Sequence, residues 1–358
     1  MEEQNGDREK RRPGLVAGRT VADTGERPLI DLITRRLTLS PEVVLGVGDD
    51  AAVLRSPPGL LLFTTDMLVE GIHFRVGYGT AEQLGYKALA VSVSDIAAMG
   101  GMPWAAVVSL ALPGSMPAAF VTSLYQGLDR AARQFQVSVV GGDTVASPGP
   151  LVINVALTGK AVEGAVVTRQ GARPGDLVFV TGSLGAAAAG LYVLENPGPW
   201  PAEASRFVQR RFLDPVPQLE AGNLLAAGGA SALDDNSDGL AQEMHEICRA
   251  SSVGCLIEVE RLPVETPVRE IAAVAGRSVW EWALHGGEDY GLVACVPPAR
   301  AGLEEVCRSA GIALTAVGRI AAREEGLYVV WPDGRRAPLL PGGFEHFPPA
   351  GGCNGGTA

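Results

Sequence analysis

Residues 137–181 read VSVVGGDTVASPGPLVINVALTGKAVEGAVVTRQGARPGDLVFVT, and this stretch decides how the chain divides. It holds two apolar runs rich in β-branched residues, 137–140 and 151–160, which predict strands. Residues 162–175 then contain Arg, Gly and Pro without a clear period, which is typical of a linker. A third strand-like run at 177–181 starts the pattern again. The stretch therefore predicts the end of one α/β domain, a linker, and the beginning of a second domain.

Helical and strand-like segments alternate on both sides of this linker. A capping box, Thr80-x-x-Gln83, predicts a helix that runs toward Met99. The other predicted elements are helices at 29–37, 118–134, from 183 onward and at 240–250, and strands at 43–47, 60–64 and 104–112. This alternation predicts the α/β class.

The two ends of the chain lack this alternation. Residues 1–26 are polar and aperiodic, and residues 348–358 are rich in Pro and Gly, so we expect both ends to be mobile. The expected domains are therefore residues 27–161 and residues 162–347.

Charge and composition exclude several classes of protein. The 358 residues include 29 basic and 40 acidic side chains, a net charge of −11, so the chain as a whole has no electrostatic attraction for nucleic acid or anionic lipid. The three lysines are Lys10, Lys87 and Lys160, and none follows the glycine pattern of a phosphate-binding P-loop. No His-Arg-Asp triplet of an ordinary protein kinase occurs. These absences remove the commonest types of ATP-using enzyme.

Cysteine usage and hydropathy predict the compartment. The five cysteines form no C-x-x-C pair and are odd in number, which favours reduced buried thiols over disulfides. No run approaches the roughly 18 apolar residues that a membrane span needs, and residues 1–27 lack the apolar core of a signal peptide. We therefore expect a cytoplasmic protein without a membrane partner.

Six short blocks share one pattern, an apolar run followed by a Gly- or Ser-containing turn that holds carboxylates. The blocks are Gly48-Asp49-Asp50, Thr64-Thr65-Asp66, Ser94-Asp95, Gly141-Gly142-Asp143-Thr144, Asp235-Asn236-Ser237-Asp238-Gly239 and Gly286-Gly287-Glu288-Asp289. Carboxylate and hydroxyl oxygens suit Mg²⁺, which is usually held by a few carboxylates together with substrate phosphates. Several Mg²⁺ ions would supply the positive charge that a P-loop lysine supplies elsewhere.

A structural interpretation of the same blocks stays open. Asp and Gly are the commonest turn residues, and the Ser-Asp-Gly block suits the N-cap of the helix that follows it. His73 suits a ligand contact or a structural loop histidine, and Arg169 suits a phosphate contact or a linker charge. Spacing alone does not show that the six blocks converge.

Taken in order, the blocks resemble the thiamine-monophosphate kinase family, within a superfamily that includes aminoimidazole-ribonucleotide synthetase and selenophosphate synthetase. The resemblance runs from about residue 29 to residue 347. It rests on GVGDDAAVL at 46–54, TTDMLVEGIHF at 64–74, YKALAVSVSDIAAMG at 86–100, GGDT at 141–144, SDGL at 237–240, GGEDY at 286–290 and GFEHF at 343–347.

The resemblance implies a fold, a reaction and a set of site residues. The fold is the two-domain aminoimidazole-ribonucleotide synthetase-like fold, of the α/β (α+β) class, in which each domain is a mixed β-sheet packed with helices. The reaction is ATP-dependent phosphorylation of thiamine monophosphate to thiamine diphosphate by a homodimer. Mg²⁺ ligands would be Asp50, Thr64, Thr65, Asp66, Asp95, Asp143, Asp235 and Asp238; ATP contacts Gly142, Arg169 and Ser237; and substrate contacts His73, Glu288 and Phe344.

Two positions depart from the family pattern. Gly291 stands where the family commonly has Glu, and Phe344-Glu345 stands where it commonly has Trp or Tyr followed by Asp. Both departures bear on the shape of the thiamine pocket.

The chemistry of this substrate calls for no catalytic side chain. The attacking oxygen belongs to a phosphate monoester whose second pKa is near 6, so it is largely deprotonated at neutral pH and needs no general base. Catalysis then consists of in-line positioning and of Mg²⁺ neutralising two phosphate groups that repel each other.

Two alternatives remain at this point. The first is another ATP-dependent synthetase of the superfamily; selenophosphate synthetases characteristically carry a reactive Cys near the N-terminus, whereas the first cysteine here is Cys248. The second is a non-catalytic module that binds Mg-nucleotide, which loss of motif carboxylates would favour, but all of the matched carboxylates are present.

Overall fold

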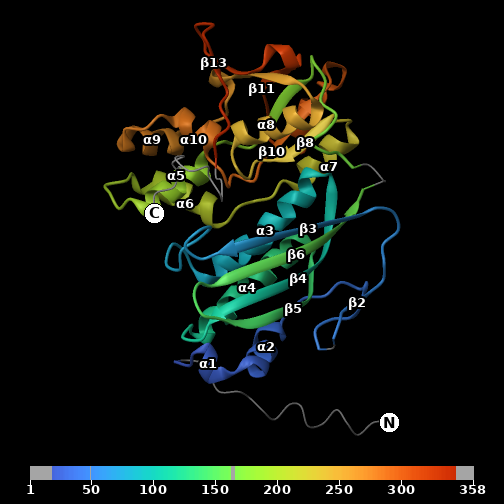
Figure 1. Cartoon of the computed structure of the whole chain (residues 1–358), viewed down its shortest axis with the longest axis vertical. Coiled ribbons are helices and arrows are strands. Elements are labelled where there is room, and N and C mark those ends of the chain that lie inside the picture. Colours follow the sequence, from blue (N-terminus) through green and yellow to red (C-terminus); the bar gives the residue numbers. More distant parts are fainter. Residues whose placement is uncertain (1–17, 49, 163–165, 344–358) are drawn as a thin grey trace.

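Two main β-sheets, one in each half of the chain, organise the computed structural model, which describes residues 18–48, 50–162 and 166–343 (Figure 1). The first sheet has four strands in the order β3-β6-β4-β5, and the second has seven in the order β13-β12-β9-β11-β7-β10-β8. A separate two-stranded sheet pairs β1 with β2.

The first half of the chain forms one mixed sheet covered by helices on one face. Its elements are α1 Val21–Thr24, α2 Glu26–Thr34, β1 Val43–Leu45, β2 Val53–Leu54, β3 Leu61–Val69, α3 Ala81–Ala98, β4 Gly101–Pro113, α4 Ala118–Phe135, β5 Ser138–Ser147 and β6 Val152–Ala161. Strands β4 and β5 are parallel, whereas β3–β6 and β4–β6 are antiparallel. Burial alternates along β3 and β6, as expected when only one face of a sheet is covered. The other face, which carries Phe63 and Met67, stays exposed.

Helices α3 and α4 lie against each other with unusually close backbones. A Cβ atom on Gly85 would lie 1.8 Å from the carbonyl oxygen of Leu124, and one on Gly127 would lie 1.8 Å from that of Glu82. Only glycine permits so close an approach between the two helix backbones. The capping box predicted from Thr80 and Gln83 is present at the start of α3.

The second half of the chain forms a larger, almost wholly antiparallel sheet flanked by helices. Its elements are β7 Leu177–Thr181, α5 Ala186–Glu195, α6 Ala202–Leu213, α7 Leu219–Ala227, β8 Ala232–Asp235, α8 Leu240–Ser251, β9 Gly254–Glu258, η1 Val259–Arg261, α9 Thr266–Ala275, α10 Val279–His285, β10 Leu292–Val296, η2 Pro298–Arg300, α11 Leu303–Ser309, β11 Leu314–Ala321, η3 Arg323–Glu325, β12 Leu327–Val330 and β13 Arg336–Pro338. Only β9 and β12 pair in parallel. Both halves are mixed sheets packed with helices, as the family resemblance implied.

Helix α3 joins the two halves. It lies on the first sheet and also contacts α7, α6 and β8 of the second half (Figure 1). Its buried residues include Ser92 and Ser94, which is unusual for polar side chains and indicates that they have partners. The end of α3 therefore places side chains of the first half against the second.

Several sequence-based predictions of local structure were wrong. Three of the acidic blocks are not turns: Thr64-Thr65-Asp66 lies within β3, Gly141–Thr144 lies within β5, and Ser94-Asp95 lies within α3. Gly142 lies on strand β5 so close to β4 that a Cβ there would lie 1.9 Å from the carbonyl oxygen of Val108, which explains why this position has glycine. The Gly286-Gly287-Glu288-Asp289 block follows helix α10 and precedes β10 rather than following a strand.

The ends of the chain differ in part from expectation. Residues 20–24, inside the predicted extension, include a capped helix α1 that donates backbone hydrogen bonds to Met116 and Gly114. Residues 1–17 and the predicted tail 348–358 lie outside the described residues. Among the described helices, none combines the length and apolar character that crossing a membrane requires.

Candidate active site

Carboxylates from both halves of the chain meet beside the carboxyl end of α3. Asp66 lies on β3, Asp95 on the last turns of α3, and Asp235 at the end of β8. A cavity of about 540 Å³ opens at this boundary and is lined by Thr64, Asp95 and Asp235, among others. These four residues, all predicted Mg²⁺ ligands, are the ones the structure brings together, and we call them the boundary cluster.

Each carboxylate of the boundary cluster accepts a hydrogen bond from a hydroxyl group. Ser92 Oγ donates to Asp66 Oδ2 at 2.7 Å, and Ser94 Oγ donates to Asp235 Oδ2 at 2.6 Å across the domain boundary. Thr64 Oγ1 donates to Asp95. Neutral hydroxyls orient the carboxylates without neutralising their charge. The cluster is therefore held in place by hydrogen bonds that supply no positive charge.

The environment of the boundary cluster disfavours ionisation in the absence of a cation. Burial and the nearby Asp95 raise the pKa of Asp66 to about 6, although the Ser92 hydrogen bond opposes the rise. Burial and then Asp95 raise the pKa of Asp235 well above its usual range. Burial also raises the pKa of Asp95. Raised carboxylate pKa values of this origin are typical of sites built for a positive ligand.

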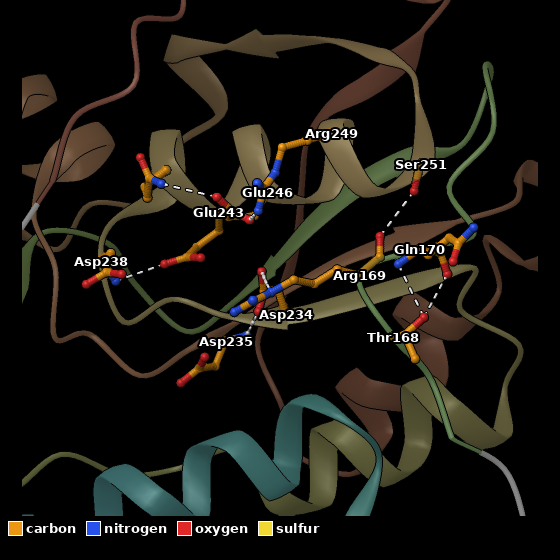
Figure 2. A network of polar contacts seen from close by, with 11 residues as sticks. Thr168, Arg169, Gln170, Asp234, Asp235, Asp238, Glu243, Glu246, Arg249 and Ser251 are labelled. Atoms are coloured by element: carbon orange, nitrogen blue, oxygen red, sulfur yellow. Dashed lines mark hydrogen bonds and ion pairs between the residues drawn. The ribbon is translucent and has the colours of Figure 1, made fainter. Parts of the chain in front are cut away.

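Arg169 lies at the centre of a second group of charges next to this cluster. Figure 2 shows its guanidinium between Asp234 of β8 and Glu243 of α8, and Arg169 Nε donates to Asp234 Oδ2 at 2.7 Å. Burial and, as the next largest cause, the negative charge of Asp234 raise the pKa of Glu243 to about 9. The Arg169 side chain is half-exposed and lines the 540 Å³ cavity, so it presents a cation where the carboxylates supply negative charge.

The turn after α10 lies along the 235–238 segment. Glu288 N donates to Ser237 O at 2.6 Å, and Tyr290 N donates to Asn236 O at 3.0 Å. Asp289 accepts hydrogen bonds from the backbone N–H groups of residues 185 and 187, at the start of α5. The predicted contacts Ser237, Asp238 and Glu288 thus belong to two adjoining segments whose backbones are hydrogen-bonded.

His73 lies in the loop that follows β3. Its Nδ1 accepts a hydrogen bond from Val69 N at 3.0 Å, which leaves the proton of a neutral ring on Nε2. The ring orientation is therefore fixed by the backbone.

Other predicted site residues lie away from the boundary cluster. Thr65 points to the exposed face of the first sheet, because side chains alternate along β3, and its Oγ1 accepts a hydrogen bond from Asn154. Gly142 and Asp143 lie on β5, three strands from β3, a separation of about 14 Å at the usual strand spacing. Asp50 lies in the connection between β1 and β2. Phe344 lies outside the described residues.

The donor set of the boundary cluster fits Mg²⁺. The oxygens are hard ligands, and they come from side chains whose raised pKa values a cation would lower. Within the part of the chain that the structure describes, no three His, Cys, Asp or Glu side chains lie close enough together to hold one ion by themselves. Mg²⁺ usually keeps several waters and completes its shell with substrate phosphates, so one or two carboxylates per ion suffice.

Sequence reasoning missed several polar residues of this region. Asp234 and Glu243 were not selected, because only Asp235 and Asp238 belong to the recognised motif. Ser92 and Ser94 were quoted within a motif but given no role. Their signal was available, since two serines two residues apart interrupt the apolar run that begins at Ala88, just before Asp95.

Comparisons with known proteins bear on the whole chain. The model of the family AIR synthase related protein, N-terminal domain, matches residues 48–161, and that of the corresponding C-terminal domain matches residues 173–330. Thiamine-monophosphate kinase of Bacillus subtilis (strain 168) is 35% identical over 328 residues, which cover 90% of this chain and 99% of that protein. The kinase of Escherichia coli (strain K12) is 36% identical over 309 residues, with 86% and 93% covered.

Solved structures show the same relationship. The crystal structure of thiamine-monophosphate kinase from Stenotrophomonas maltophilia K279a matches with a TM-score of 0.76 and 32% identity, over 86% of this chain and 96% of that chain. AaThiL complexed with AMPPCP and TMP matches with a TM-score of 0.72 and 35% identity, over 90% and 97%. A hydrogenase maturation protein HypE shares the fold, with a TM-score of 0.72 and 22% identity over 89% and 98%.

Proposed function

Because this chain belongs to the thiamine-monophosphate kinase family, we propose that it transfers the γ-phosphoryl group of ATP to thiamine monophosphate in a Mg²⁺-dependent reaction. The products are thiamine diphosphate and ADP. One observation of the structure carries the proposal: both halves of the chain contribute a carboxylate, the partly buried Asp95 and the buried Asp235, to a cavity that also contains a cationic side chain, Arg169.

The residues of this chain act by binding and orientation. Asp66, Asp95 and Asp235 would hold Mg²⁺, with Asp50, Thr64, Thr65, Asp143 and Asp238 completing the predicted ligand set. When bound, Mg²⁺ neutralises the charge of the two phosphate groups that must approach each other. Ser92, Ser94 and Thr64 orient the carboxylates through their hydroxyl groups.

Substrate recognition is divided between two groups of residues. Gly142, Arg169 and Ser237 would contact ATP, and the guanidinium of Arg169 suits a phosphate oxygen because it offers several donors. His73, Glu288 and Phe344 would contact thiamine monophosphate, and the carboxylate of Glu288 suits the positive charge of a thiazolium ring. The attacking phosphate oxygen needs no general base, since it is already largely ionised at neutral pH. The transfer is then direct and in line.

We also propose that the chain forms a homodimer through the exposed face of the first sheet. Phe63 on that face is 72% exposed, and the apolar side chains Leu61, Met67, Val107 and Val145 are also exposed. A monomer rarely leaves so many large apolar side chains of one sheet in water. A second copy of the chain would cover them.

We place the reaction in the cytoplasm. The four cysteines in the described part of the chain are all free and buried, which suits a reducing compartment.

Product analysis tests the proposed function. Purified protein is incubated with ATP, Mg²⁺ and either thiamine monophosphate or free thiamine, with a chelator as control, and the products are separated by chromatography. We expect thiamine diphosphate and equimolar ADP from the monophosphate alone, and none with the chelator. Folded protein that binds ATP but forms neither product would contradict the kinase proposal and favour a binding module or another synthetase of the superfamily.

A further inference from the structure

Helix α3 presents Lys87 and Ser94 to the second half of the chain, and only Ser94 contacts a residue of the boundary cluster. Lys87 and Ser94 are seven residues apart, which is about two helical turns, so they lie on the same side of the helix. Ser94 bonds to Asp235, as described above. Lys87 reaches the other segment of the candidate site, the turn that contains Glu288. The two contacts together tie α3 to both segments.

Lys87 is enclosed in an environment that is unusual for a lysine. The residue is 2% exposed, its Nζ lies 3.0 Å from Glu288 Oε2, and the same atom lies 3.6 Å from the ring centroid of Phe212. A buried ammonium group is costly unless a carboxylate faces it, and breaking such a pair leaves the remaining charge uncompensated. Burial lowers the pKa of Lys87, and Glu288 opposes that change. The buried charge of Lys87 is therefore compensated only while Glu288 keeps its position. The same ion pair holds the carboxylate of Glu288 in place.

Glu288 occupies a backbone conformation that its surroundings must enforce. Its φ is +67° and that of Tyr290 is +50°, both in the left-handed region that non-glycine residues rarely adopt. A Cβ on Gly287 would lie 2.5 Å from the carbonyl oxygen of Ser237, so the turn also lies directly against the neighbouring segment. The Glu288 side chain remains 25% exposed, so it is accessible to a ligand while it pairs with Lys87.

Lys87 lies on the side of the site predicted for thiamine monophosphate. It lines a narrow cavity together with residues 74–80, which directly follow His73, and with Phe212 of α6. The cavity around Arg169 shares no lining residue with this one. A change at Lys87 is therefore expected to affect the surroundings of His73 and Glu288 but to leave those of Arg169 as they are.

We propose that Lys87 is a positioning residue that holds the Glu288 carboxylate at the domain boundary and thereby sets the affinity for the phosphate acceptor, and not for ATP. This inference rests on the proposed function, because it assigns Glu288 to the acceptor. Lys87 itself contacts neither substrate. It fixes the distance between α3 and the 286–290 turn, as Ser94 does between α3 and Asp235.

Steady-state kinetics of Lys87→Met test the inference. Methionine keeps the length and apolar stem of the side chain but removes the charge. We expect the KM for thiamine monophosphate to rise at least about tenfold, since small displacements of a binding group have effects of this size or larger, while the KM for ATP changes less than about threefold. Lys87→Arg, which keeps the charge, should recover part of the loss. Lys160→Met is the matched control, because the ammonium of Lys160 lies over Trp104 within the first half of the chain.

A double-mutant cycle separates positioning from general stability. If Lys87 acts through Glu288, Lys87→Met in a Glu288→Gln background should change the KM for thiamine monophosphate less than about twofold. An equal rise in both KM values, or the full tenfold effect of Lys87→Met in the Glu288→Gln background, would overturn the inference.

Hydrogen exchange provides a readout that does not depend on kinase activity. The amide of Glu288, which donates to Ser237 O, should exchange faster in Lys87→Met than in the wild type, while residues 314–321 of β11 should be unchanged. Unchanged exchange at Glu288 would overturn the positioning role. If Lys87→Met does not fold, Lys87→Gln is measured in the same way. If the wild type makes no thiamine diphosphate but the amide of Glu288 still exchanges faster in Lys87→Met than in the wild type, the proposed function is overturned. The positioning of Glu288 by Lys87 is then retained.

Discussion

The boundary cluster and the exposed face of the first sheet both carry predicted Mg²⁺ ligands, but they differ in the burial and the hydrogen bonding of these ligands within a single chain. At the boundary, Asp235 is buried and Asp66 and Asp95 are partly buried, each accepts a hydrogen bond from a hydroxyl group, and Asp95 raises the pKa of both Asp66 and Asp235. On the exposed face, Asp143 accepts a hydrogen bond from its own neighbour, Thr144 N, at 2.8 Å. We propose that a cation completes the boundary cluster, whereas a further molecule would have to cover the sheet face.

This difference separates two kinds of contribution to function. Buried carboxylates concentrate negative charge in a place that water screens poorly, so they attract a cation strongly. An exposed carboxylate on a sheet attracts a cation as strongly only after a ligand or a second subunit excludes water from it.

The largest effect is expected from Asp66→Asn. This change removes one negative charge from the boundary cluster, and we expect kcat to fall at least about 100-fold, as is typical when a group that stabilises transferring phosphate is lost. The fold should persist, because an amide replaces a carboxylate whose ionisation is already disfavoured. Turnover assays and circular dichroism check both parts. Near-normal kcat would remove Asp66 from the metal site.

A somewhat smaller loss is expected from Asp143→Asn on the exposed sheet face. We expect most activity to be lost, roughly 10- to 100-fold in kcat/KM, because the family resemblance assigns this residue to Mg²⁺. Stability should be unchanged, since the side chain is exposed. Kinetics at increasing Mg²⁺ check the assignment, because excess metal should restore part of the activity. Full activity at limiting Mg²⁺ would show that the boundary cluster suffices alone.

Phe63→Asp tests what covers the exposed face. Phe63 is 72% exposed in the single chain, so an aspartate there should not destabilise the monomer. In a dimer that buries this face, an unpaired carboxylate would cost about 2 kcal/mol or more. We therefore expect analytical ultracentrifugation to show a dimer for the wild type and mostly monomer for the variant. A dimer that persists in Phe63→Asp would place the interface elsewhere.

The smallest effect concerns pH and stability. Asp66 titrates at about 6 in the folded chain against an ordinary value of 3.8, so the folded state binds the extra proton more tightly than the unfolded state. Stability from this group is fully present below pH 3.8 and is lost as pH rises through about 6. We expect the Tm of the metal-free protein to fall by a few degrees between about pH 4 and pH 7, apart from contributions of other groups.

Mg²⁺ and a matched variant isolate the contribution of the cluster. Saturating Mg²⁺ at 100 times its Kd would add about 2.7 kcal/mol and should remove most of the decline. Asp66→Asn should have a flatter pH profile than the wild type. Identical profiles with and without Mg²⁺ would show that no ion binds at these carboxylates.

The two-domain α/β architecture could be predicted from local sequence patterns, whereas the boundary carboxylates were selected through the family resemblance, and their role as metal ligands stays a prediction. The strand at 177–181 and the capping box at Thr80 are confirmed. The opposite orientation of Thr64 and Thr65 was missed, because their block was interpreted as a turn. The block lies in a strand, and the alternation of side chains along a strand places the two threonines on opposite faces of the sheet. The Lys87–Glu288 pair joins residues that are 201 positions apart, so no local sequence pattern predicts it.

We propose that the carboxylates at the domain boundary hold the metal of a phosphoryl transfer to thiamine monophosphate. Crystals grown with a non-hydrolysable ATP analogue, thiamine monophosphate and Mn²⁺ in place of Mg²⁺ test it most directly, because anomalous scattering locates Mn²⁺ without reference to the protein. We predict anomalous peaks in contact with Asp66, Asp95 and Asp235, between the two phosphate groups. If both substrates are bound and Mn²⁺ is absent from these three carboxylates, the boundary cluster is not the metal site.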